Sequence, residues 1–162
     1  MKVHGTAGVK LIECINPAKD KWRVRWNVQP DQAEGCEGGV TYEEAEFSRK
    51  PSIDEIKKVV IDWINNRVDD DILRGFTWND IPVWLSMQNQ FNYKAAYDLA
   101  VQTSGSSLPV TFKFGTEAEP VYHTFTELSD ITDFYVKAVA YTEKVLNDGW
   151  VEKDSYDFTP YE

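Results

Sequence analysis

The sequence predicts an α+β fold in which antiparallel β-hairpins carry helices packed on one face. Runs of β-branched and aromatic residues occur in pairs, and a short turn-forming segment joins the two runs of each pair. Each pair precedes a segment whose apolar residues recur at intervals of three and four, the spacing of a helix that lies on a sheet. This hairpin–helix pattern occurs three times in succession, at residues 11–66, 72–102 and 109–147.

The first unit opens with a predicted hairpin of residues 11–15 and 22–28, joined by a turn at residues 16–20. Apolar and polar residues alternate along the second strand, so one face should be buried and the other wet. The apolar set is Trp22, Val24, Trp26 and Val28, and the polar set is Arg23, Arg25 and Asn27. We expect residues 40–47 to form an edge-like strand, because Glu43 and Glu44 discourage further pairing.

The helix of the first unit has a clear start signal. Ser52 and Glu55 stand at the spacing of a capping box, directly after Pro51. A helical stripe follows at Ile53, Ile56, Val59, Val60, Trp63 and Ile64. Residues 65–67, with two asparagines, are expected to close the helix, which leaves the acidic run at residues 69–71 in a loop.

The second unit is a predicted hairpin of residues 72–78 and 81–85, followed by a helix from Met87 to about Gln102. Pro82 cannot donate a ladder hydrogen bond, which fits an edge strand or a first strand position. Ser86 is the expected N-cap of the helix. The helix presents two adjoining apolar sides, one made of Phe91, Ala95 and Leu99 and the other of Tyr93, Ala96, Tyr97 and Ala100.

The third unit pairs residues 109–114 with residues 121–125 and continues into a long helix, from 127 to about 147. Gly149 stands where a glycine beyond a helix end is expected. The tail, residues 150–162, keeps four aromatic residues that favour docking back onto the fold.

The length of 162 residues indicates one domain, 1–162, with a subdivision into residues 1–68, 69–150 and a tail at 151–162. A net charge of −10 argues against a nucleic-acid partner. We find neither an apolar run long enough for a membrane span nor a secretory signal, so the default expectation is a reduced intracellular chain. Whether Cys14 and Cys36 pair stays open, since two cysteines do not mark a disulfide scaffold.

No catalytic signature accompanies this architecture. The two histidines, His4 in an expected mobile terminus and His123 in a strand, have no metal-ligand spacing around them. Cys14 would need His123 as an activating base, and the carboxylates at Glu43, Glu44 and Glu46 are better explained as solvated surface. We therefore expect no enzyme activity, no metal and no cofactor.

The most distinctive stretch is residues 75–99, which is dense in aromatic, Asn and Gln side chains. Aromatic side chains of this kind either form a core or anchor a partner or a sugar. The candidate binding residues are Trp78, Trp84, Asn89, Gln90 and Tyr93. Burial in the core between hairpin and helix is the simpler explanation for any one of the rings, and an exposed subset remains open.

Three segments of this stretch carry a resemblance: Gly75-Phe76-Thr77-Trp78, Val83-Trp84-Leu85-Ser86 and Asn89-Gln90-Phe91-Asn92-Tyr93-Lys94-Ala95-Ala96. They resemble proteins encoded by phages and prophages of gut Bacteroidales. The layout is similar to a domain of unknown function found in and beside phage tail-fibre proteins. The resemblance covers roughly residues 55–150 and leaves the N-terminal hairpin unaccounted for. It implies a phage context, with a virion-associated or assembly role, and it supplies no catalytic residues.

Two functions follow as expectations. The first is a non-catalytic phage or prophage protein, tail-associated or an assembly factor, that acts through contacts with a protein partner or with itself and shows an exposed apolar patch. The alternative is a glycan-binding module that uses Trp78, Trp84 or Tyr93 as a stacking platform, with Asn or Gln beside it.

Overall fold

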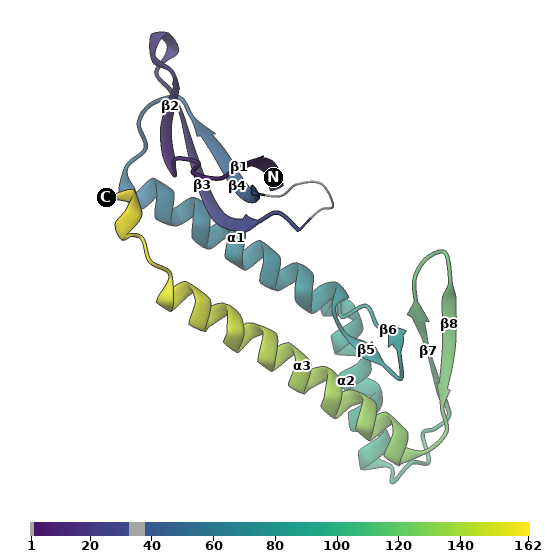
Figure 1. Ribbon diagram of the computed structural model, residues 1–162. Helices are drawn as coiled ribbons and strands as arrows, with labels where there is room; N and C mark the ends of the chain where they lie inside the picture. Colours follow the sequence, from purple (N-terminus) through teal and green to yellow (C-terminus); the bar gives the residue numbers. More distant parts are fainter. Residues whose placement is uncertain (1, 33–37) are drawn as a thin grey trace. The chain divides into compact units, whose positions relative to one another are not determined.

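The computed structural model describes residues 2–32 and 38–162 and has an α+β fold, which confirms the predicted class (Figure 1). Antiparallel strands precede each of its three α-helices along the chain. The chain divides into two compact units. One contains residues up to 63 together with 155–162, and the other contains residues 64–154.

The first unit is built on a four-stranded antiparallel sheet with the strand order β1-β4-β3-β2. Its strands are β1 (Lys2–Thr6), β2 (Ile12–Asn16), β3 (Lys21–Pro30) and β4 (Gly39–Phe47), and a short 3-10 helix, η1 (Pro17–Lys19), joins β2 to β3. Two expectations were wrong here. The N-terminus is a strand, in which His4 contacts Asp31 at 2.6 Å, and β4 is an inner strand. The acids of β4 do not protect an edge, because Glu43 lies opposite Lys2 and Glu44 lies opposite Arg25.

Strand β3 departs from the expected alternation at two places. Arg25 is buried, although it belongs to the polar set, and its guanidinium donates to the Lys10 carbonyl at 2.8 Å and to Glu13 at 2.9 Å. Val28 is exposed, because the backbone is left-handed at Asn27 (φ 51°) and the pairing with β4 shifts there. The strict alternation of buried and wet faces therefore fails at both positions.

Helix α1 (Ile53–Arg74) starts as predicted. The Ser52 hydroxyl accepts from the Glu55 amide at 3.3 Å, and the Glu55 carboxylate accepts from the Ser52 amide at 2.9 Å. The predicted end at residues 65–67 was wrong, because Val68 and Ile72 continue the apolar stripe of Ile64. The acidic run at residues 69–71 therefore lies on the helix and not in a loop.

The second unit contains the C-terminal part of α1, from residue 64, together with two hairpins and two further helices. Its other elements are β5 (Thr77–Trp78), β6 (Ile81–Pro82), α2 (Met87–Gln102), β7 (Val110–Gly115), β8 (Pro120–Phe125) and α3 (Leu128–Ser155). The prediction for α2 is confirmed to the residue, and Ser86 caps it by accepting from the Asn89 amide at 3.2 Å. The pairing of β7 with β8 is also confirmed. Strands β5 and β6 are shorter than expected, and the turn between them holds Asn79 and Asp80 at positive φ.

Helix α3 runs on through Gly149, so the predicted helix end near 147 was wrong. Beyond α3 the tail forms a short 3-10 helix, η2 (Thr159–Tyr161), in the first unit. There Tyr161 is buried and donates its hydroxyl to the Arg25 carbonyl at 2.9 Å. The predicted tail docks in its last part, whereas residues 150–155 belong to α3 and Trp150 there is 53% exposed.

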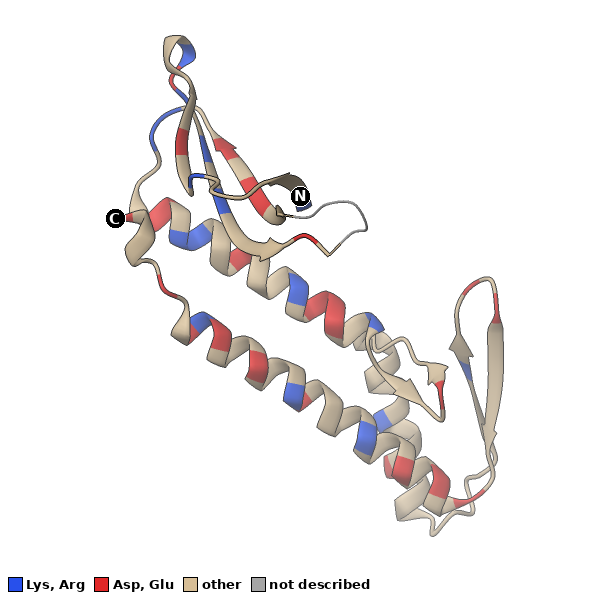
Figure 2. Cartoon of the chain, in the orientation of Figure 1, with Lys and Arg blue, Asp and Glu red and all other residues tan. Residues whose placement is uncertain are grey.

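Charged residues of both signs are interleaved along α1 and α3 (Figure 2). Many charged residues of the helices form ion pairs with a residue four positions away. These pairs are Lys58–Asp62, Asp70–Arg74, Lys94–Asp98, Asp133–Lys137 and Lys144–Asp148. Such exposed pairs add little to stability and keep the surface solvated. Within the described ranges no helix is both long and apolar enough to cross a membrane.

Candidate functional site

The five candidate binding residues have different environments in the second unit. Trp78 and Tyr93 are core residues, exposed by only 5% and 3%, so neither ring can serve as a stacking platform. Trp84 is 47% exposed. Asn89 and Gln90 lie in the first turn of α2. Of the three candidate rings, only Trp84 faces solvent.

Local backbone pairing fixes the outward direction of Trp84. The Val83 amide donates to the Phe76 carbonyl at 2.9 Å, and the Leu85 amide donates to the Leu73 carbonyl at 3.0 Å. Val83 and Leu85 are both buried, at 1% and 2% exposure. Because successive side chains of an extended segment point to opposite sides, Trp84 between them must point outward.

Trp78 occupies the centre of the aromatic core. Its ring lies within 4.8–5.6 Å of the rings of His123, Phe125 and Phe134, measured between centroids. Its indole N–H reaches the Asp133 carboxylate at 3.0 Å, which satisfies the single polar atom of the side chain. Lys137 and then Trp78 donate hydrogen bonds to Asp133 and lower the pKa of that carboxyl group. Trp78 is therefore a structural residue.

Tyr93 joins α2 to the same core. Its ring contacts Phe112 at 4.8 Å and Phe134 at 5.0 Å between centroids, both edge to face. Burial disfavours the charged phenolate and raises the pKa of Tyr93 to about 12.

Asn89 and Gln90 use their side-chain amides to fix the start of α2. The Asn89 Nδ2 donates to the Trp84 carbonyl at 2.8 Å, and the Gln90 Nε2 donates to the Leu85 carbonyl at 2.7 Å. These bonds hold the extended segment 82–85 against the helix. The nitrogen atoms of both amides are thus engaged within the fold, and the oxygen atoms remain as acceptors.

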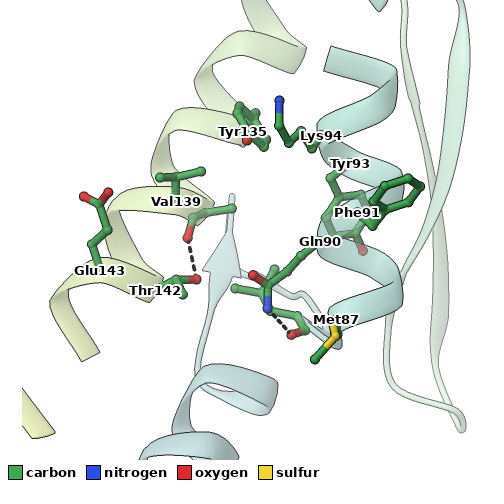
Figure 3. A pocket seen from close by; sticks show the side chains of 11 residues that line it. Met87, Gln90, Phe91, Tyr93, Lys94, Tyr135, Val139, Thr142 and Glu143 are labelled. Atoms are coloured by element: carbon green, nitrogen blue, oxygen red, sulfur yellow. Dashed lines mark hydrogen bonds between the residues drawn. The ribbon is translucent and has the colours of Figure 1, made fainter. Parts of the chain in front are cut away.

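A mostly apolar groove of about 350 Å³ lies between α2 and α3. Figure 3 shows Tyr135, Val139, Thr142 and Glu143 from α3 across from Gln90 and Lys94 of α2. Met87 and Phe91, one helical turn apart, also line it. Stacking of Tyr97 on Tyr135, at 4.5 Å between centroids, holds the two helices together farther along α2.

Four exposed apolar residues of α2 form a stripe, and Val101, which is 47% exposed near the end of the helix, lies off it. Met87 is 87% exposed, Phe91 70% and Leu99 51%, and Ala95 between them is also exposed. The four residues are spaced by four along the helix, so they lie on one face. We refer to Met87, Phe91, Ala95 and Leu99 as the α2 stripe. The sequence predicted two adjoining apolar sides for this helix. In the structure, the side with Tyr93 and Ala100 faces the core, and the side with Phe91, Ala95 and Leu99 is exposed.

A second pocket, of about 460 Å³, borders Trp84. Arg74 lies over the Trp84 ring, with 5.6 Å from its guanidinium carbon to the ring centroid. Asn89, Lys113 and residues 115–117, at the end of β7 and the turn after it, also line the pocket. Two of the five candidates, Trp84 and Asn89, are brought together here, whereas Gln90 and Tyr93 line the α2–α3 groove.

The titratable residues considered for chemistry belong to different units of the chain. Cys14 lies on β2 in the first unit, and Cys36 lies outside the described residues. His123 is in the second unit, wedged between the rings of Trp78 and Phe125 at 4.8 Å and 4.5 Å. Across residues 2–32 and 38–162 no group of three or more His, Cys, Asp or Glu side chains has the geometry of a metal site.

Comparison of the chain with models of protein families, with curated proteins and with solved structures finds no match. Function is therefore inferred from the chain's own surfaces.

Proposed function

We propose that this chain is a non-catalytic structural or assembly protein that acts through protein–protein contacts, and that the α2 stripe is the contact surface. The observation that carries the proposal is the exposure of three large apolar side chains, Met87, Phe91 and Leu99, along one face of α2. Scattered surface hydrophobics need no explanation, but an aligned set of them marks an interaction site.

Burial of the α2 stripe by a partner would be energetically favourable compared with leaving its side chains in water. Complete burial of a side chain such as Phe, Leu or Met is favourable by about 1.5–3 kcal/mol. Phe91, at 70% exposure, has most of that gain still available. Aromatic residues at the centre of an interface also contribute more than their neighbours. We therefore assign Phe91 as the anchor of the contact.

The partner that fits this surface is an amphipathic helix. Side chains spaced by four form a ridge, and such a ridge packs into the groove between ridges of another helix. At the Met87 and Phe91 end, the stripe is continuous with the α2–α3 groove, which has room for a projecting apolar side chain. Lys94 beside the groove is paired with Asp98 at 2.5 Å, so its charge stays compensated when an apolar partner approaches.

The biological setting that accompanies the proposal is a phage or prophage, with the protein tail-associated or acting in assembly after synthesis in the host cytoplasm. The support is the resemblance of the segments within residues 75–96. Mass spectrometry of purified particles and of assembly intermediates from the source phage tests the setting separately from the contact surface.

The test of the contact surface measures mass in solution by light scattering, with photo-crosslinking from position 91. The variant Phe91→Ser/Leu99→Ser is compared with Val136→Ser, which removes a 54% exposed apolar side chain from α3. We expect the stripe variant to lose self-association or the crosslink to a tail or assembly protein, while Val136→Ser keeps it. The proposal fails if the natural chain stays monomeric and uncrosslinked in cells that produce the phage, or if both variants behave alike.

A further inference from the structure

The pocket beside Trp84 is a concave site, whereas the α2 stripe is an exposed face of a helix. Its lining includes the side chains of Val83 and Phe114, which are buried at 1% and 2% exposure. Trp84 also lines it, with nearly half of its surface exposed. A volume of about 460 Å³ is within the range of small-molecule sites. The pocket thus offers a flat aromatic surface beside two buried side chains.

Two cations border this aromatic surface. The Arg74 guanidinium lies over the indole ring, and its Nε is held by Asp70 at 3.1 Å, so the terminal nitrogens remain as donors. Lys113 is exposed and forms no salt bridge with the described residues. Glu117 is also at the pocket. With Asp70 and Glu117 nearby, the net charge is small, which suits one carboxylate better than a phosphate.

A hydrogen-bond acceptor completes the lining. Asn89 uses its Nδ2 to donate to the Trp84 carbonyl, so its Oδ1 is left to accept from a ligand hydroxyl. Aromatic surface, cations and an amide acceptor therefore converge in one concave site.

We propose that this pocket binds a carboxylated sugar residue. The apolar C–H face of the pyranose ring packs on the Trp84 indole, the carboxylate contacts Arg74 and Lys113, and a ring hydroxyl donates to Asn89. None of the residues of the α2 stripe takes part in this site. The test of sugar binding is therefore independent of the proposed contact at the α2 stripe.

The test is isothermal titration calorimetry with a tetrasaccharide that contains glucuronic acid. The matched ligand is the same tetrasaccharide with its carboxylates reduced to alcohols. We expect the acidic form to bind at least about tenfold more tightly than the reduced form. Equal binding of both forms, or no binding of either at millimolar concentration, would overturn the proposal.

Matched variants locate the site. Trp84→Ala should abolish the binding, whereas Trp150→Ala, which removes another indole that is 53% exposed, should leave it unchanged. Lys113→Gln should reduce the preference for the acidic form, and Lys144→Gln on α3 should not. Since the side chains replaced in all four variants are at least partly exposed, we expect each variant to fold, which near-ultraviolet circular dichroism checks. Binding that survives Trp84→Ala places the ligand elsewhere and contradicts the proposal.

Discussion

Gly149 of α3 lies directly against Val68 of α1. A Cβ atom at position 149 would overlap the Val68 Cγ2 methyl group. Both residues are buried, in the part of α1 that lies beside α3 within the second unit. Two further contacts join the same helices nearby, an ion pair between Arg67 and Glu152 and a hydrogen bond from Lys153 to Asn65 at 2.9 Å. The absence of a side chain at 149 is what lets the two backbones approach.

We expect Gly149→Ala to destabilise the protein. Alanine gains roughly 1 kcal/mol of helix propensity over glycine, but overpacking of a filled interface costs about 1–3 kcal/mol. Because the clash is with a β-branched residue on another helix, the packing cost should exceed the gain in helix propensity. The free energy of unfolding, measured in urea, reports the net effect.

The double variant Val68→Ala/Gly149→Ala provides the control, since it removes the two methyl groups that the new side chain meets. Its destabilisation should be smaller than the sum of the two single changes. A Gly149→Ala variant more stable than the natural chain would show that the packing cost is smaller than the gain in helix propensity, against the prediction.

The same substitution at Trp78 and at Trp84 should cost very different amounts of stability. Trp78→Ala should cost about 3–5 kcal/mol, because it empties the centre of the aromatic core and leaves Asp133 without its indole donor. Trp84→Ala should cost far less, since the ring is 47% exposed. Thermal unfolding of the two variants compares them directly. Similar losses of stability would mean that Trp84 also belongs to the core.

Local signals in the sequence predicted the bounds of α2 and the pairing of β7 with β8 well. Ser86 has a short side chain that can cap a helix in only one register, and this fixed the start of α2 at Met87. Likewise, Ser52 and Glu55 fixed the start of α1. These features depend on neighbours within a few residues, so they can be read without knowledge of the fold.

Long-range packing explains what the sequence could not predict. Gly149 looks like a helix end when taken alone, and only its contact with Val68 shows why glycine stands inside α3. The same holds for Arg25, whose burial depends on Lys10 and Glu13 from another strand region. For the candidate site, the outward direction of Trp84 follows from simple alternation, whereas the choice between the two apolar sides of α2 required the position of α3.

We predict that the buried phenol of Tyr93 makes the protein less stable at high pH. The ordinary pKa of tyrosine is about 10, and burial raises it to about 12 in the folded chain. Above pH 10 the unfolded chain releases this proton while the folded chain keeps it, so stability falls as the pH rises from about 10 to 12. The slope approaches about 1.4 kcal/mol per pH unit for one such group. Urea unfolding between about pH 9 and 11 should show it.

Tyr93→Phe tests the assignment. This variant has no phenol to ionise at position 93, so its stability should fall less steeply over the same pH interval. Tyr141 and Tyr161, whose pKa values are also raised by burial, contribute to the remaining slope, as do Lys94 and Lys144, whose pKa values are raised by hydrogen bonds to Asp98 and Asp148. An unchanged slope in Tyr93→Phe would exclude Tyr93 as a contributor.

We predict that the carboxyl group of Glu55, at the start of α1, has an unusually low pKa. Hydrogen bonds from Arg49, and then from the Ser52 amide, lower the pKa of Glu55 to about 2. The charged form is favoured in the folded chain, so its contribution to stability is present above pH 4.5 and is lost as the pH falls towards 2. Side-chain NMR titration of Glu55 should therefore show a midpoint near 2. Arg49→Gln removes the larger cause of the low pKa, the hydrogen bond from Arg49, and should move that midpoint most of the way back to the ordinary value. The control is Lys58→Gln, which breaks an exposed pair with Asp62 on the same helix and should leave the Glu55 midpoint in place. A midpoint near 4.5 in the natural chain would mean that the capping contacts of Glu55 do not persist in solution.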